Sequence, residues 1–248
     1  MIGAHRWPDK SGAGLHALQP NADQRPTLYE GPESRLPSVY QLPGPLDDLK
    51  SLTTQRWMAL AGFEGSFEQP AWTALVAIKV DRRTKHGTVL LTSKPNSSSR
   101  VGFRFVDKCE DPPCLEFKAR THDVGDIRTS HPVGPDWEIW EFVHLDGTMR
   151  LLVGGEERGV GPFDLSEPLD HTVATLGGRP HRSQGAKECL QGHLGEGLFY
   201  DRALTDDERN RVRAYLTAKW EPTGVFPTVK RQKGTPKPGK ATPRRRKN

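Results

Sequence analysis

Two carboxylates on one strand face are the first residues to look for, because retaining glycosidases use such a pair about 5 Å apart to break a sugar bond. The nearest approach in this sequence is Glu138 and Glu141, which stand three positions apart within Glu-Ile-Trp-Glu. Residues at i and i+3 of a strand point to opposite faces of a sheet, so these two cannot share a cleft. We expect surface carboxylates here, and the spacing gives no support for catalysis.

Residues that form nucleophilic or metal sites do not stand at the spacings such sites need. The nine His show no H-x-x-x-H or H-x-H pattern, and neither G-x-S-x-G nor G-x-x-x-x-G-K-[ST] occurs. Cys109 or Cys189 could act as a nucleophile only with a His partner, which sequence alone does not locate. Cys109 and Cys114 bracket Glu-Asp-Pro-Pro, and they either close a small disulfide loop or remain free thiols. We predict no cofactor.

Binding residues are better represented than catalytic ones. Trp137 and Trp140 are the candidate ligand-binding residues, because an indole ring can stack on a sugar. Trp140 shares a strand face with Phe142 and His144, which a core Trp would also do. Asp9 is a weak candidate for calcium, since one carboxylate is far short of the six to eight oxygens that this ion takes. Its ordinary role would be to bond nearby amides of a turn.

The positive charge of the chain is concentrated at its end. The formal net charge is +5, and residues 230–248 hold nine Lys or Arg and no acidic residue, so the rest carries 5 − 9 = −4. This Lys-, Arg- and Pro-rich segment has no apolar pattern, which predicts disorder. It either binds polyanions such as nucleic acid or an anionic membrane surface without specificity, or only keeps the chain in solution. Its candidate anion-binding residues are Lys230, Arg231, Lys233, Arg244, Arg245, Arg246 and Lys247.

Composition divides the chain into one domain at residues 1–222 and a basic tail at residues 223–248. No run approaches the roughly 18 apolar residues that a membrane helix needs. The first residues lack the apolar segment of a secretory signal. We therefore expect either a cytoplasmic protein or a fragment of a longer secreted one.

The elements that position these residues are predicted to be short strands joined by Gly- and Pro-rich turns. Residues 72–80 alternate in hydrophobicity, and Asp146-Gly147 is typical of a two-residue hairpin. No helix separates the strands, which excludes a parallel α/β sheet and favours an all-β, two-layer antiparallel sandwich. Further apolar strands are predicted at residues 88–92, 101–106, 114–119, 138–145 and 149–153.

Residues 192–220 are predicted to close the domain with a strand, a turn and one C-terminal helix. Thr205 and Glu208 form a capping box, and Pro222 ends the helix. Helical periodicity gives an apolar face of Leu204, Val212, Tyr215, Leu216 and Trp220. The solvated side is expected to hold Arg209, Arg211, Arg213 and Lys219.

The same stretch resembles the C-terminal end of the domain in the laminin-G-like, concanavalin-A-like jelly-roll family. In that family the domain ends with a strand that runs from G-x-I-x-E to Y-D-R-x-L, followed by a helix that contains E-R, Y-L and K-W. The matching residues are Gly192, Leu194, Glu196, Tyr200, Asp201, Arg202, Leu204, Glu208, Arg209, Tyr215, Leu216, Lys219 and Trp220. A stretch near the N-terminus resembles the loop with which the family's domain is entered. The matching residues are Trp7, Asp9, Ser11, Gly12, Gly14, His16 and Ala17. The resemblance covers about residues 7–220 and implies a jelly-roll sandwich.

That family begins with an apolar N-terminal strand ahead of the entry loop, lying beside the closing strand, and this strand is apparently missing here. We therefore expect an exposed sheet edge beside residues 193–200, where aggregation or a partner strand is possible.

The resemblance implies a non-catalytic binding or adhesion module that recognises a glycan or an extracellular protein. A structural or assembly module that pairs through the open edge is one alternative. A divergent carbohydrate-active enzyme is the other. Calcium is the one cofactor that the family context leaves open, without a ligand cluster to support it.

Overall fold

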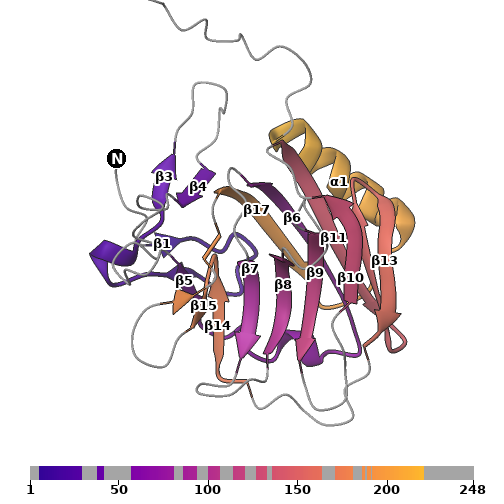
Figure 1. Ribbon diagram of the computed structural model, residues 1–248, viewed down its shortest axis with the longest axis horizontal. Helices are drawn as coiled ribbons and strands as arrows, with labels where there is room; N and C mark the ends of the chain where they lie inside the picture. Colours follow the sequence, from indigo (N-terminus) through magenta and orange to yellow (C-terminus); the bar gives the residue numbers. More distant parts are fainter. Residues whose placement is uncertain are drawn as a thin grey trace, which may run out of the picture.

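The computed structural model describes most of the chain between Arg6 and Trp220 (Figure 1). The Cys109–Cys114 pairing and the tail at residues 223–248 lie outside the described part. The described ranges are 6–29, 38–41, 57–80, 86–93, 100–106, 114–120, 127–132, 136–163, 171–180, 186–187, 189–190 and 192–220.

One layer, which we call sheet A, is a seven-stranded antiparallel sheet in the order β13-β12-β11-β6-β17-β4-β3. The closing strand β17 (Gly192–Tyr200) pairs along β6 (Ala71–Val80) on one side and with β4 (Ser38–Gln41) on the other. The remaining strands are β3 (Thr27–Tyr29), β11 (Trp137–Leu145), β12 (Thr148–Val153) and β13 (Glu156–Pro162).

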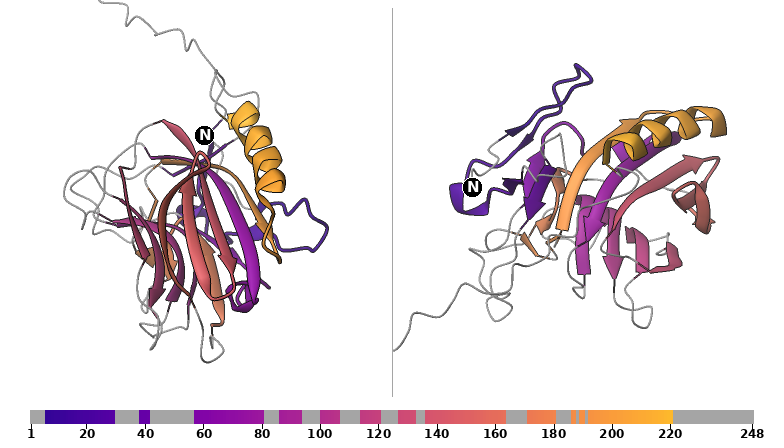
Figure 2. Two further views of the ribbon diagram at one scale, coloured as in Figure 1. Left: turned by 90° about the vertical axis from the view of Figure 1, so that its right-hand side faces the viewer. Right: turned by 90° about the horizontal axis from the view of Figure 1, so that it is seen from above.

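The other layer, sheet B, has eight strands in the order β1-β2-β5-β14-β7-β8-β9-β10, and its pairs are also antiparallel. Figure 2 shows the two sheets face to face, with the helix on the outer side of sheet A. The strands of sheet B are β1 (Arg6–Trp7), β2 (Ala17–Leu18), β5 (Met58–Leu60), β7 (His86–Ser93), β8 (Arg100–Val106), β9 (Cys114–Arg120), β10 (Ile127–Pro132) and β14 (Val173–Leu176). Smaller elements are β15 (Arg179–Pro180), β16 (Ala186–Lys187), η1 (Ala22–Gln24) and η4 (Ser66–Glu68).

The core between the sheets is aromatic. The rings of Phe103 on sheet B and Phe142 on sheet A stack with centroids 3.8 Å apart, and both are fully buried beside Trp72. Alternation along β6 places Leu75 and Ala77 on the opposite face, toward the helix. The residues of β6 that face the core are Trp72, Ala74, Val76, Ile78 and Val80, which confirms the alternation predicted for residues 72–80.

Two tight turns set the register of the hairpins in sheet A. Asp146 and Gly147 both have positive φ, 49° and 70°, as a type I′ turn between β11 and β12 requires. Gly154 and Gly155, at 59° and 89°, make the corresponding turn between β12 and β13. The Asp-Gly hairpin predicted from the sequence is therefore confirmed.

The α-helix of the described part of the chain, α1 (Asp206–Trp220), lies on the outer face of sheet A against β6 and β11 (Figure 2). The Thr205 amide donates to Glu208 Oε2 at 2.9 Å, and the Glu208 amide donates to Thr205 Oγ1 at 3.3 Å. This reciprocal pair confirms the capping box. Leu216 and Trp220 pack beneath the helix in a second apolar cluster.

Two side chains of α1 face the opposite way from the prediction. Arg209, expected in solvent, is 5% exposed, and Tyr215, expected on the apolar face, is 48% exposed. Arg209 is buried because it pairs with Glu141 of β11 at 3.7 Å and with Asp206 at 2.6 Å. A buried ion partner thus overrides the helical hydrophobic pattern at this position.

The edge beside the closing strand is partly covered. β4 pairs with β17 at residues 192–194, so the predicted open edge is wrong there. Along residues 196–200, within the described part of the chain, no strand pairs on the side away from β6. The Phe199 ring packs on Phe63 with centroids 4.9 Å apart. An accessible edge at residues 196–200 stays a prediction.

The fold class is confirmed as an all-β sandwich of two antiparallel sheets with one C-terminal helix. Seven predicted strands, the closing strand included, lie at described strands, whereas β10 and β13 are among those that were missed. Their sequences, IRTSHP and EERGVGP, are too polar or too rich in Gly to show an apolar alternation. Among the described residues, no helix is long and apolar enough to cross a membrane.

Candidate functional site

Residues of the closing motif converge on one carboxylate, Glu196. Lys219 Nζ donates to Glu196 Oε2 at 2.5 Å. Tyr215 Oη and Trp220 Nε1 reach the same carboxylate at 3.3 and 3.4 Å. Burial acts to lower the pKa of Lys219, but its hydrogen bonds to Glu196 and Tyr215 outweigh this, so the pKa lies above its ordinary value. These residues fasten the end of α1 to β17, which is a structural role.

A second anchor holds the first half of α1. Arg213 Nη1 donates to Glu141 Oε1 at 2.5 Å, beneath the helix, where the Glu141 side chain is fully buried. A Cβ at Gly155 would lie 2.4 Å from Arg213 Cζ, so residue 155 must lack a side chain to leave room for the guanidinium. Glu138 lies on the other face, where its Oε2 accepts from Trp140 Nε1 at 2.8 Å. The predicted separation of Glu138 and Glu141 is confirmed, but the expected surface position is wrong for Glu141, which is buried with its Arg partner.

The two candidate Trp residues lie on opposite faces of β11. Trp140 is fully buried in the core between the sheets, so its ring has no surface on which a sugar could stack, and its candidacy is corrected. Trp137 is half-buried on the helix side, with its ring centroid 5.2 Å from that of Trp220 and 6.0 Å from that of His193. Sugar stacking at Trp137 therefore stays a prediction.

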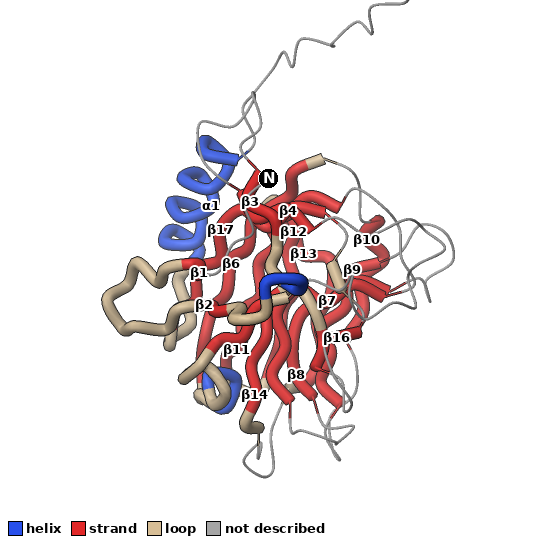
Figure 3. Tube along the Cα trace, turned by 90° about the vertical axis from the view of Figure 1, so that its left-hand side faces the viewer, coloured by secondary structure: helices blue, strands red, loops and turns tan. Residues whose placement is uncertain are grey.

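Asp9 organises the loop between β1 and β2, which projects from the sheets (Figure 3). Its Oδ1 accepts from the Ser11 amide at 2.7 Å, and its Oδ2 accepts from Ser11 Oγ at 2.9 Å and from the Leu15 amide at 3.1 Å. The bonds from Ser11 lower the pKa of Asp9 to about 2. Among the described residues, no group of three or more His, Cys, Asp or Glu could hold a metal ion, and calcium at Asp9 stays a prediction.

The outer face of sheet B carries charge across three neighbouring strands. Val101 and Phe103 of β8 point into the core, so Arg100 and Arg104 lie on the outer face. The register places Glu116 of β9 opposite Arg104, and Arg128 of β10 opposite Glu116. We call Arg100, Arg104, Glu116 and Arg128 the basic face.

Glu116 is the centre of the basic face. Arg104 donates from Nε and Nη2 to Glu116 Oε1 at 2.9 and 2.7 Å. Arg128 Nε donates to Glu116 Oε2 at 2.9 Å. The Glu116 and Arg104 side chains are buried, whereas 42% of the Arg128 side chain is exposed. The arrangement presents a guanidinium to solvent with its orientation fixed by a buried carboxylate.

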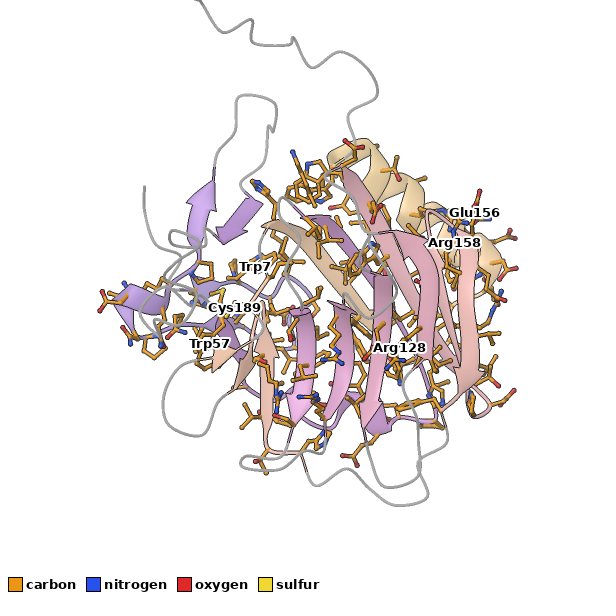
Figure 4. All side chains as sticks on the ribbon, viewed as in Figure 1. Trp7, Trp57, Arg128, Glu156, Arg158 and Cys189 are labelled. Atoms are coloured by element: carbon orange, nitrogen blue, oxygen red, sulfur yellow. The ribbon has the colours of Figure 1, made fainter. Side chains whose placement is uncertain are left out.

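Two glycines of β13 allow β10, the strand that carries Arg128, to pack closely against it. A Cβ at Gly159 would lie 3.1 Å from the carbonyl oxygen of Arg128, and one at Gly161 would lie 2.8 Å from Ile127 Cγ1. The two glycines therefore let β10, the edge of sheet B, pack directly on β13, the edge of sheet A. Figure 4 shows Arg128 apart from Arg158, which is on β13 itself.

Sequence reasoning missed the basic face because its residues come from three strands. Arg104 follows Phe103 in VGFRFV, which was read as an apolar strand. The usable signal was the alternation itself, since Arg100, Arg104 and Glu116 all have the parity opposite to their apolar neighbours. The pairing register, which brings Arg104 and Arg128 to one carboxylate, has no counterpart in the linear pattern.

No protein-family model matches this sequence, and no curated protein matches it. Among solved structures, Trypanosoma rangeli sialidase in complex with a difluoro-KDN has a TM-score of 0.58 at 13% identity, covering 90% of this chain and 32% of that one. The fourth domain of an extracellular GH43 arabinanase from Geobacillus stearothermophilus, in complex with arabinotriose, has a TM-score of 0.54 at 16% identity. It covers 75% of this chain and 81% of that one.

The chain spans about a third of the length of the sialidase that it matches. At these identities the likeness concerns the fold, which is the two-sheet all-β sandwich described above. The jelly-roll class is supported in this way, while membership of the laminin-G-like branch remains an expectation. The chain is thus similar in fold to parts of sialidase and arabinanase structures.

Proposed function

We propose that this chain is a non-catalytic glycan-binding module and that the basic face of sheet B is its binding surface. The observation that carries the proposal is the fixed group of Arg104, Glu116 and Arg128. A sugar site needs a small number of polar groups held in set positions. Two guanidinium groups bound to one buried carboxylate meet that need, because their geometry does not change when a ligand arrives.

The location also favours the basic face. A two-layer sandwich has two outer faces, and α1 lies on that of sheet A, where Glu141 and Glu196 serve to hold the helix. Within the described part of the chain, no helix packs on the basic face, so its charged residues do not serve to hold one. The similarity in fold to an arabinanase domain that was solved with arabinotriose supports a carbohydrate as the ligand.

The absence of catalysis is part of the same proposal. Glu116 has an Arg on each side, at 2.7 Å from Arg104 and 2.9 Å from Arg128, which favours a positioning role for this carboxylate. Glu138 and Glu141 lie on opposite faces of β11 and cannot act on one bond. These arrangements favour binding over hydrolysis.

A glycan array with the full-length chain, followed by calorimetry on the best polysaccharide, tests the proposal. We expect binding that Arg128→Ala weakens and that Trp137→Phe leaves unchanged. Loss with Trp137→Phe alone would move the site to the surface beside His193 and Trp220. The proposal fails if no glycan binds, or if the polysaccharide is hydrolysed and one carboxylate substitution stops the turnover.

Pairing with a protein partner through residues 196–200 of β17 is the competing function. Concentration-dependent dimerisation in analytical ultracentrifugation, without glycan binding, would favour such an assembly module.

A further inference from the structure

The loop between β1 and β2 brings two hydrogen-bond donors to one histidine. The Asp9 amide donates to His16 Nδ1 at 2.9 Å, and Arg6 Nη2 lies against His16 Nε2 on the other side of the ring. A neutral imidazole has one N–H and one lone pair, so it accepts from only one of the two donors. The Asp9 bond has an ordinary length and comes from the backbone, whereas Arg6 is an exposed side chain. We therefore assign the lone pair to Nδ1 and the hydrogen to Nε2.

This tautomer makes Arg6 and His16 two donors that face each other. A guanidinium has no acceptor atom, so it cannot satisfy the Nε2–H of the ring. Within the described part of the chain, no carboxylate pairs with Arg6. The carboxylate of Asp9 already accepts from Ser11 and from the Leu15 amide. An oxygen from outside the chain is therefore what would satisfy both donors.

The donor pair is open to solvent, and its loop is held in shape. Arg6 is exposed and His16 is half-buried. The loop projects from the sheets (Figure 3), and a Cβ added at Gly12 or Gly14 would meet nothing within 4 Å. The bond from the Asp9 amide fixes the direction of the imidazole. A ligand would thus meet a donor that is already oriented, which lowers the cost of binding.

We propose that Arg6 and His16 bind a carboxylate group of a ligand, with one oxygen accepting from the guanidinium and the other from His16 Nε2–H. Arg6 supplies one positive charge and the neutral imidazole supplies none, so a single negative charge balances the pair. The two oxygens of a carboxylate match the two donors. A phosphate group near neutral pH carries more negative charge than this pair can balance.

This site is separate from the basic face and goes beyond the proposed function. Strand β1 is at one end of the strand order of sheet B, and β8, β9 and β10 are at the other. The carboxylate could belong to an acidic sugar or to a small organic acid. Both have the same chemistry, so the measurement below includes one of each.

Titrations of the full-length protein with sodium galacturonate, sodium acetate, galactose and sodium phosphate test the proposal. The imidazole signals of His16 are followed by nuclear magnetic resonance at constant ionic strength. We expect both carboxylates to shift these signals and galactose to leave them unchanged. Arg6→Gln should weaken carboxylate binding about tenfold, the usual effect of losing a charged hydrogen bond. Arg6→Lys should restore only part, because an ammonium lacks the planar fork.

Lys10→Gln is the matched control. Lys10 is exposed in the same loop, so Lys10→Gln and Arg6→Gln each remove one cation from it. Equal losses from the two variants would show that net charge alone is responsible and would overturn the inference. Unchanged near-ultraviolet circular dichroism of Arg6→Gln shows that a loss comes from the site rather than from misfolding.

The remaining outcomes test the donor count and the ligand class. Proton–nitrogen correlations of the His16 ring identify its tautomer, and a hydrogen on Nδ1 would overturn the assignment. Tighter binding of phosphate than of either carboxylate would overturn the ligand class, and no shift with any anion would remove the site. Tighter binding of galacturonate than of acetate identifies an acidic sugar. Each of these failures leaves glycan binding through Arg128 standing.

Discussion

A buried charge needs a partner in the folded protein, and Glu141 illustrates this at the scale of one residue. Its side chain is fully buried between Arg213 at 2.5 Å and Arg209 at 3.7 Å. Glu141→Ala would leave both guanidinium groups beneath α1 without this carboxylate. We expect the free energy of unfolding to fall by about 3–5 kcal/mol, as measured by urea denaturation with Trp fluorescence.

Glu157 provides the control for that measurement. It pairs with Arg150 at 2.6 Å, but both side chains are about two-fifths exposed. Solvent screens such a pair, so Glu157→Ala should change the free energy of unfolding by about 0–1 kcal/mol. If the two substitutions had equal effects, the buried cluster would not be what holds the helix.

Glu208 gives a prediction for acid pH at the same scale. Hydrogen bonds from Arg202, then from the Thr205 amide and hydroxyl, lower the pKa of Glu208 from 4.5 to about 2. The folded-state pKa lies below the unfolded value, so its contribution to stability is complete above pH 4.5 and is lost as the pH falls toward 2. We expect α1 to keep its capping box at pH 4.

Carboxyl-carbon nuclear magnetic resonance of Glu208 measures this midpoint directly. In Arg202→Ala the largest cause of the shift is removed, so the midpoint should rise toward 4.5. A wild-type midpoint near 4.5 would contradict the bidentate contact, in which Arg202 donates to both Glu208 oxygens at 2.9 and 2.7 Å.

At the scale of elements, α1 fits against β17 only where the strand has no side chain. A Cβ on Gly195 would lie 2.6 Å from the Trp220 ring, at the point where the register between β17 and β6 shifts. Gly195→Ala must displace the buried Trp220 or the strand. We expect a loss of about 1–3 kcal/mol in the free energy of unfolding, the usual cost of overpacking.

Gly197 lies two residues further along the same strand and is the natural comparison. A Cβ there meets nothing within 4 Å, and its φ is not positive. Gly197→Ala should therefore be neutral or slightly stabilising, because Ala restricts the unfolded chain. Thermal melts of the two variants side by side decide the matter, and equal melting temperatures would show that Trp220 does not need the bare backbone.

Elements whose signals are local could be predicted from the sequence, and those that depend on pairing could not. The Asp146-Gly147 turn and the Thr205–Glu208 capping box depend on residues at most three apart, and both are present. Arg209 was placed in solvent because its partner Glu141 is 68 positions away in the chain. A helical wheel contains no information about such a partner.

The candidate site shows the same division. Trp137 and Trp140 were chosen because they are aromatic. The alternation along β11 could not show that Trp140 is fully buried between two sheets. The group at Glu116 depends on the register of β8, β9 and β10, and β10 itself was not predicted. Register is set by packing across the whole sandwich, which a linear sequence pattern does not contain.

At the scale of the whole molecule, charge is divided between two basic regions on an acidic remainder. The basic face, with three Arg and one Glu, carries 3 − 1 = +2 at fixed positions of the sheet, and residues 230–248 carry nine cations. A folded face can select a ligand by geometry, whereas a segment without an apolar pattern or aromatic residues offers only attraction between charges. The two regions should therefore differ in how their binding responds to salt.

Replacing the cations of the tail by Gln tests this separation in the full-length chain. Binding to single-stranded DNA, measured by fluorescence anisotropy, should weaken, and the slope of log K against log salt should fall by up to about 5, at roughly 0.7 for each lost phosphate contact. Binding of a polysaccharide to the basic face should keep its dependence on Arg128. If the tail variant lost that dependence as well, the tail and the basic face would form one site. The substituted residues are Lys230, Arg231, Lys233, Arg244, Arg245, Arg246 and Lys247.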